Sequence, residues 1–184
     1  MNESVAYDRA GRRIIECVEN GELTLPFWYV YDNSDNGVPP IFWPNVPFAE
    51  TEAYQAAGLW RSAPTLAELA AKIDVPADAL EASVARFNDH CANQKDTDFH
   101  RGDEAYERIV VYGNSPLVPI GDGPYHAAAF GLSDLGTKGG LRTDEHARVL
   151  NTSGHVLEGL YAAGNTMAAV SGEAYPGGGN PVGS

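Results

Sequence analysis

The chain has 184 residues, a formal net charge of −13 and two cysteines. This length suits one domain, or one domain and part of another. The excess of acidic residues argues against nucleic acid or an anionic membrane as a partner, because both would repel the chain. No apolar run approaches the roughly 18 residues of a membrane span, and the first residues lack the apolar region of a secretory signal. We therefore expect a cytoplasmic globular protein.

The first half of the chain alternates between helical and irregular patterns. Residues 3–19 are polar, with a few apolar positions on one face, and favour a helix. The aromatic and β-branched run Phe27–Tyr31 lies between Pro26 and the turn-rich DNSDNG and predicts a strand. Residues 32–48 hold four prolines and three large aromatic side chains. Side chains of that size are usually buried, so we expect an ordered but irregular loop.

From Glu50 to Asn93 the pattern is helical. Ser62 and Thr65 are candidate caps for a helix whose apolar stripe lies at positions i, i+3, i+4 and i+7. Pro76 breaks this pattern, and a second helix follows. The two stripes are Leu66, Leu69, Ala70 and Ile73, then Leu80, Val84, Phe87 and Cys91. We expect a helical pair that packs on another part of the chain and carries no chemistry.

After Gly113 glycine and proline become frequent and helical signals fade. Residues around Asp144-Glu145-His146 alternate between apolar and polar side chains, as in a hairpin. The segments suited to strands are Tyr125–Phe130, Gly140–Thr143, Ala147–Leu150 and Leu160–Ala163. We expect an α+β chain with a mostly helical cap domain at 1–118 and a β-rich domain at 119–184.

The clearest signal is glycine-rich. A strand ending at Ala163 would deliver Gly164 and Asn165 to its carboxyl end, where ligands bind in α/β folds. Tyr175 then opens a loop that carries Gly177, Gly178, Gly179 and Gly183. Glycines let a backbone come close to a flat or phosphorylated ligand, so this loop predicts a ligand cradle. The alternatives are an ordinary turn at Gly164-Asn165 and a flexible tail after Tyr175.

In order, the segments DFHRG, GPYHAAAF, DLGTKGGLRTDEHARVL, GLYAAGN and SGEAYPGGGNPVG resemble the C-terminal half of a flavoprotein family. This family contains 3-ketosteroid dehydrogenases and the flavin subunits of fumarate reductase and succinate dehydrogenase. The pattern YPGxGxxxG, here Tyr175 through Gly183, is most similar to the 3-ketosteroid Δ1-dehydrogenase branch. The resemblance covers 98–184 firmly and the earlier segments more loosely.

The resemblance implies FAD as the cofactor and a C-terminal part of a Rossmann-like FAD-binding domain. The implied cofactor-binding residues are Gly139, Gly140, Ala163, Gly164, Asn165, Gly178, Asn180 and Val182. The amides of the glycine loop would stabilise the negative charge that develops on a reduced flavin. The family's GxGxxG unit, which grips the ADP half of FAD, has no match in this sequence. We expect that segment to be supplied in cis or by a partner chain, so the FAD-binding domain of this chain would be incomplete.

The resemblance also assigns the catalytic residues. Tyr175 and the backbone N–H of Gly179 would hydrogen-bond the C3 carbonyl of a steroid. Polarising a ketone acidifies the neighbouring carbon, so a base can remove its proton while the next carbon gives a hydride to flavin N5. The alternative is a tyrosine that only packs beside Pro176.

Two other residues, Lys138 and His126, leave the choice between function and structure open. Lys138, among the glycines of DLGTKGG, suits a flavin phosphate or ring oxygen, or simply an exposed hairpin. His126 titrates near neutrality and could carry a proton, but a histidine among small strand residues is more often structural. Cys17 and Cys91 have no CxxC spacing and His90-Cys91 point different ways, so we expect no metal.

One departure from the steroid branch concerns residues 33–47, where that branch carries tyrosines. Here the stretch reads NSDNGVPPIFWPNVP, without tyrosine. Its apolar side chains still favour a large apolar substrate over a small dianion. We expect dehydrogenation of a steroid-like apolar ketone. The alternatives are reduction of an activated alkene such as fumarate, and a non-catalytic piece that binds a partner chain.

Overall fold

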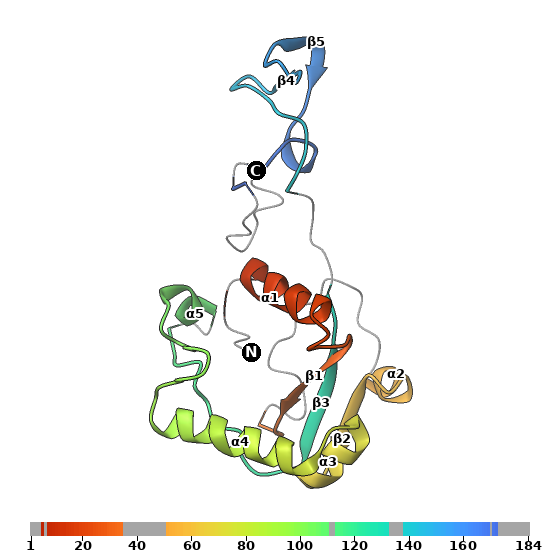
Figure 1. Cartoon of the computed structure of the whole chain (residues 1–184), viewed down its shortest axis with the longest axis vertical. Helices are drawn as coiled ribbons and strands as arrows, with labels where there is room; N and C mark the ends of the chain where they lie inside the picture. The colour runs from red at the N-terminus through yellow and green to blue at the C-terminus, as the bar shows by residue number, and fades with distance from the viewer. Residues whose placement is uncertain are drawn as a thin grey trace. The chain divides into compact units, whose positions relative to one another are not determined.

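The computed structural model has a mixed α/β fold (Figure 1) and describes residues 5, 7–34, 51–110, 113–132, 138–169 and 171–172. Contacts divide it into two compact units, Met1–Ser4 with Glu16–Gly131 and Val5–Ile15 with Leu132–Ser184. Each unit is described by itself. Helix α1 (Tyr7–Glu19), which contributes residues to both, confirms the helix expected near the start of the chain. None of the helices in the described ranges is long and apolar enough to cross a membrane.

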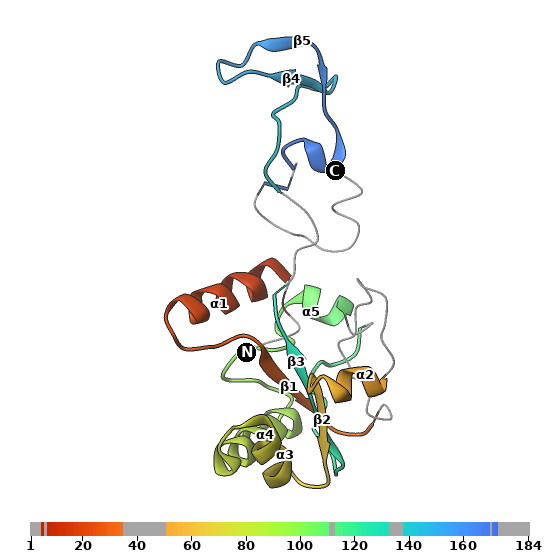
Figure 2. The same cartoon turned by 90° about the vertical axis from the view of Figure 1, so that its right-hand side faces the viewer.

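The first unit contains an antiparallel sheet of three strands. Strands β1 (Phe27–Tyr31) and β3 (Tyr125–Phe130) confirm the two predicted strands at their predicted bounds. The strand order is β1-β3-β2, with β3 in the centre (Figure 2). Strand β2 (Trp60–Ala63) corrects the expected helix, because these residues pair with Ala128 through Tyr125 of β3. Ser62 is therefore a strand residue and not a helix cap.

Helices α3 (Leu66–Ile73) and α4 (Ala77–Ala92) confirm the predicted helical pair. Thr65 caps α3, since its hydroxyl oxygen accepts a hydrogen bond of 3.2 Å from the Glu68 N–H. The chain leaves helical geometry at Asp74, in the left-handed region, before Val75-Pro76 starts the next helix. The two helices thus begin and end where capping and proline chemistry predict.

The core of the first unit lies between this helical pair and one face of the sheet. Alternate strand residues point to the same face, so Ala63 of β2 and Ala127 of β3 both contact the apolar stripe of α3. Leu69 of that stripe has no exposed surface. The core is Ala63, Leu69, Ile73 and Ala127, surrounded by Trp28, Val30, Val75, Leu80 and Tyr125. The opposite face of the sheet carries aromatic and polar side chains.

Two short helices complete the described part of this unit, α2 (Thr51–Ala56) and α5 (Ala105–Val110). Before α5 the chain folds over buried charged groups. Arg101 lies 4.9 Å above the Phe87 ring and donates a 2.8 Å hydrogen bond to Asp96. The Glu107 carboxylate accepts the Gly102 N–H at 2.5 Å. The DFHRG segment is therefore held by an ion pair and by a hydrogen bond from its backbone.

The second unit contains the hairpin of β4 (Arg148–Leu150) and β5 (Val156–Tyr161). An antiparallel bridge between Thr143 and Val149 extends it and confirms the hairpin pattern around Asp144. The expected strand Leu160–Ala163 is wrong in its bounds, because pairing with β4 places the strand earlier, at Val156–Tyr161. Of the expected strand Gly140–Thr143, only isolated bridges at Leu141 and Thr143 form.

The compact units divide the chain between Gly131 and Leu132, whereas the domains expected from sequence divide it at 118/119. The difference arises from β3, which lies after residue 119 yet hydrogen-bonds to both β1 and β2. The compact units and the domains expected from sequence therefore divide the chain at different places. The expected domain boundary at 118/119 stays a prediction.

Candidate functional site

Five of the predicted cofactor-binding residues lie in or beside one pair of backbone segments in the second unit. Leu141 forms an isolated parallel bridge with Met167, between residues 138–141 and 166–169. The Leu141 N–H donates to the Thr166 carbonyl at 3.0 Å, and the Ala168 N–H donates to the Leu141 carbonyl at 2.9 Å. A third bond, from the Ala169 N–H to the Lys138 carbonyl, measures 3.1 Å. This pairing brings the DLGTKGG and GLYAAGN motifs together.

Gly140 is the point of closest approach between these segments. A Cβ built on Gly140 would lie 2.4 Å from the Met167 carbonyl carbon and 2.5 Å from its oxygen. Backbone atoms cannot move aside as the end of a flexible side chain can, so any larger residue would separate the two segments. Glycine is therefore required here for the close approach of the two segments.

Gly164 and Asn165 form a single tight turn after the extended chain. Ala163 is extended, and the 3₁₀ turn η1 (Gly164–Thr166) follows with Gly164 at a φ of +60°. Glycine adopts this left-handed region without a steric penalty. The Asn165 side chain is exposed, and no residue in the described ranges hydrogen-bonds to it. Its amide can both donate and accept toward a ligand.

The remaining predicted residues lie outside the part of the chain that the structure describes. They are Tyr175, Gly178, Gly179, Asn180 and Val182. Their roles stay predictions.

His126 sits at the centre of a hydrogen-bonded group in the first unit. Its Nδ1 lies 2.7 Å from Ser62 Oγ, and its Nε2 lies 3.1 Å from Asn33 Oδ1. The ring is buried and stacks on Tyr31 with 5.3 Å between ring centroids. Burial lowers the pKa of His126 below 6.5, partly offset by the charge of Asp32. Burial likewise raises the pKa of Tyr31. His126 is thus neutral, and both of its ring nitrogens have hydrogen-bond partners. This arrangement agrees with a structural histidine rather than a proton carrier.

The turn that follows β1 is anchored to the segment that precedes β3. Asp32 accepts hydrogen bonds from the Gly121 N–H at 2.6 Å and from the Ser34 N–H at 2.9 Å, and the Ser34 hydroxyl also donates to it. Burial alone would raise the pKa of Asp32, but these hydrogen bonds lower it below 3.8. Asp32 therefore stays ionised and holds the end of β1.

The sequence pattern does not indicate this group, because it predicts a helix cap at Ser62 and a turn at Asn33, and both residues lie far from His126 in the chain. The signal that could have found them is strand register. Both Tyr31 and Ser62 face His126 across the sheet, so their side chains share its face.

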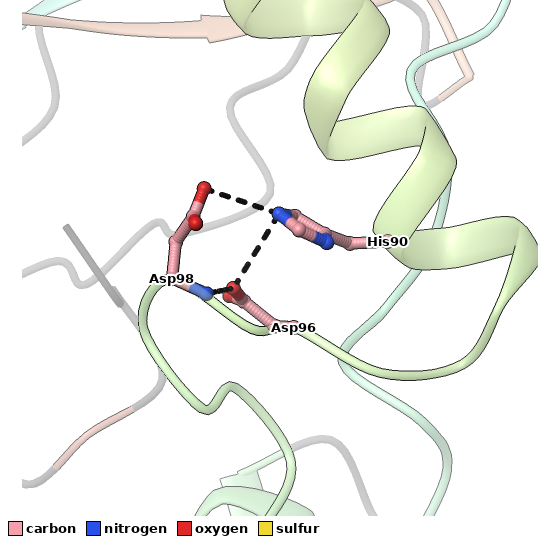
Figure 3. Close-up of side chains that lie close together, drawn as sticks. All are labelled: His90, Asp96 and Asp98. Carbon is pink, nitrogen blue, oxygen red and sulfur yellow. Dashed lines mark hydrogen bonds and ion pairs between the residues drawn. The ribbon is translucent and has the colours of Figure 1, made fainter.

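A second polar cluster joins His90, Asp96 and Asp98, which approach one another closely enough to be considered as metal ligands (Figure 3). His90 Nε2 lies 3.1 Å from Asp98 and 3.8 Å from Asp96. Both carboxylates already accept other donors. Arg86 makes two 2.5 Å bonds to Asp98, and Asp96 accepts the Asp98 and Phe99 N–H groups as well as Arg101. These bonds lower the pKa of Asp98 and Asp96 and make the cluster an ion-paired loop anchor.

Comparison with known proteins gives a consistent result. The family model described as FAD binding domain matches residues 1–182. A 3-oxosteroid 1-dehydrogenase of Mycobacterium tuberculosis is 39% identical over 196 residues, which cover 100% of this chain and 34% of that protein. A 4-oxocyclohexanecarboxylate 2-dehydrogenase of Sinomonas cyclohexanicum is 43% identical over 124 residues, covering 65% of this chain and 22% of that protein.

A solved structure agrees with these relatives. The 3-ketosteroid Δ1-dehydrogenase of Sterolibacterium denitrificans, in complex with 1,4-androstadiene-3,17-dione, matches with a TM-score of 0.79 and 34% identity. The match covers 97% of this chain and 33% of that one. This chain therefore spans about a third of the length of the two steroid dehydrogenases that it matches. The fold is that of an FAD-dependent oxidoreductase.

Proposed function

Because this chain belongs to the family of FAD binding domains, we propose that it serves the FAD-dependent dehydrogenation of a carbon–carbon bond next to a ketone. The observation that carries the proposal is the similarity along the whole chain to a 3-oxosteroid 1-dehydrogenase. The second relative is named for a ring ketone too. The substrate class we propose is accordingly a steroid-like apolar ketone.

The second unit supplies residues that fit FAD. Gly140 lets residues 138–141 pack closely against Met167, and this contact holds Gly139 and Gly140 near the Gly164 turn. We assign these glycines, with Ala163 and Asn165, to holding FAD, as the C-terminal β-rich part of a Rossmann-like domain. When bound, FAD supplies the acceptor for a hydride.

Tyr175 and the Gly179 N–H are assigned to the substrate carbonyl. Two donors on one carbonyl oxygen withdraw electrons from the neighbouring carbon and stabilise the enolate that forms when its proton leaves. A tyrosine hydroxyl can donate without being ionised at neutral pH, because its ordinary pKa is near 10. These two groups thus lower the barrier to proton removal while the ketone stays in place.

Reduction of an activated alkene is the alternative within the same family, and flavin absorbance separates the two. The FAD-loaded protein that contains this chain is mixed without oxygen with 4-androstene-3,17-dione or with succinate. We expect the ketone to bleach the oxidised flavin band and succinate to leave it unchanged. Bleaching by succinate alone would contradict the ketone proposal.

A further inference from the structure

Strand β5 is an exposed edge of the small sheet in the second unit. Strand β4 has a neighbour on each side, because it pairs with β5 and its Val149 also bridges to Thr143. Among the residues that the structure describes, β5 pairs with β4 alone, so its other edge is open. Burial reflects this difference, since Val149 is 1% exposed whereas Tyr161 of β5 is 63% exposed.

The side chains of β5 are not those of an edge that faces water. Natural edge strands commonly carry charges or proline, which discourage pairing with another strand. Strand β5 reads VLEGLY, with Glu158 as its only charged residue and no proline. Its large apolar side chains Leu157, Leu160 and Tyr161 are all exposed. Such an apolar run is typical of a strand that is covered within a larger sheet.

The sheet of the first unit provides an internal comparison. Strand β1 also lies at an edge and also has an apolar sequence, FWYVY. Every residue of β1 is nevertheless partly or fully buried, whereas all residues of β5 after Val156 are exposed. Within the described part of the chain, one apolar edge strand is therefore covered and the other is not.

The length of the relatives indicates what covers β5. The chain spans 34% of the Mycobacterium tuberculosis enzyme and 33% of the Sterolibacterium denitrificans enzyme, so about two thirds of each has no counterpart here. We propose that the open edge of β5 pairs with a β-strand from that remaining part of the protein. A second copy of this chain fits less well, because two chains with a net charge of −13 repel each other. The proposal goes beyond the proposed function, since it does not depend on the substrate.

Amide hydrogen exchange in the FAD-loaded protein that contains this chain tests the pairing. The register pairs Arg148 with Tyr161 and Leu150 with Val156, which leaves only Val149 opposite residues 157–160. Because β4 offers few acceptors to that stretch, its amides should exchange rapidly unless another strand pairs with them. We expect their exchange to be at least about a hundredfold slower than in an unstructured peptide. The Thr152 amide, in the exposed turn of the same hairpin, should exchange rapidly and is the control.

A pair of lysine variants measures whether β5 is covered. Leu160→Lys adds a charge to the strand and should lower the thermal unfolding midpoint of the same protein by at least about 5 °C, because an unpaired charge would be buried. Thr152→Lys adds the same charge in the exposed turn and should leave the midpoint within about 1 °C of wild type. Equal midpoints for the two variants would mean that β5 stays open and would overturn the proposal.

The exchange data separate strand pairing from other kinds of cover. Rapid exchange across residues 157–160 overturns the proposal even if Leu160→Lys is destabilising, because side chains alone would then cover β5. Protection that appears only at concentrations where the protein dimerises assigns the edge to a second copy and also overturns it. A protein with protected β5 amides that oxidises no ketone would contradict the proposed function and leave this inference standing.

Discussion

At the scale of single residues, Tyr175 carries the proposed chemistry. We expect Tyr175→Phe to retain FAD but to reduce ketone-dependent turnover by more than tenfold, because removing one donor to a developing oxyanion costs about a hundredfold or more in enzymes. Steady-state turnover and the bound flavin spectrum measure the two effects. Tyr161→Phe, at an exposed tyrosine of β5, is the matched control. Turnover close to wild type in Tyr175→Phe would mean that Tyr175 contributes only packing and does not bind the substrate carbonyl.

The buried His126 leads to a prediction about how the stability of the protein depends on pH. Its folded pKa is lowered by burial, so the unfolded chain takes up a proton first as the pH falls below about 6.5. The free energy of unfolding should therefore be fully retained above pH 6.5 and should decline from there down to the folded pKa. Urea unfolding at a series of pH values measures this.

His126→Gln should flatten the decline in the free energy of unfolding between neutral and mildly acidic pH. His155→Gln, at an exposed histidine, is the matched control. If the wild-type curve has the same slope as His126→Gln in that range, His126 is not a neutral buried group.

At the scale of elements, the contact between residues 138–141 and 166–169 has a steric requirement. Gly140→Ala should destabilise the protein by about 1–3 kcal/mol, since the added methyl meets backbone atoms that cannot rotate away. We also expect weaker FAD binding, because the two motifs would separate. Gly131→Ala is the control, as a Cβ at Gly131 meets nothing within 4 Å. Unfolding midpoints and FAD titrations that do not distinguish the two variants would contradict the assignment.

Helix α3 makes the corresponding prediction for the core. Leu69 is fully buried against Ala63 and Ala127 of the sheet. Leu69→Ala should reduce the free energy of unfolding by about 2–5 kcal/mol, the range for a large-to-small change in a packed core. Leu66→Ala, on the half-buried side of the same helix, should cost clearly less. Equal losses in thermal or urea unfolding would mean that α3 packs differently.

Local sequence signals predicted most helices and strands, but they missed the strand that forms only by pairing with a distant part of the chain. Thr65 and Pro76 are local signals, and α3 and α4 begin and end accordingly. Strand β2 was missed because Trp60–Ala63 is only four residues long and lies between helical patterns. What makes it a strand is pairing with β3, more than 60 residues later, and no local pattern reports such a contact.

The site residues likewise fall into those that local sequence patterns predicted and those that depend on pairing with distant strands. Gly139, Gly140, Gly164 and Asn165 belong to glycine motifs that could be recognised from sequence, and the structure brings them together. The Ser62–His126–Asn33 group could not be found, because it depends on strand register across a sheet whose third strand was not expected.

At the scale of the whole molecule, the order of the motifs indicated a flavoprotein fold, and the family comparison agrees. The combination of helices and strands was predicted, as an α+β chain, because most segments carry either a helical or a strand pattern, with β2 as the exception. The partition into compact units was not predictable, since β3 lies after the boundary that composition suggests but pairs with β1 and β2, which lie before it.

The most direct test of the proposed function is the product itself. The FAD-loaded protein that contains this chain is incubated with 4-androstene-3,17-dione and an electron acceptor, and the steroid is analysed by mass spectrometry. We predict a product lighter by two hydrogen atoms, with the new double bond next to the C3 ketone, which is the carbonyl assigned to Tyr175 and Gly179. Recovery of unchanged steroid, while the same protein interconverts succinate and fumarate, would contradict it.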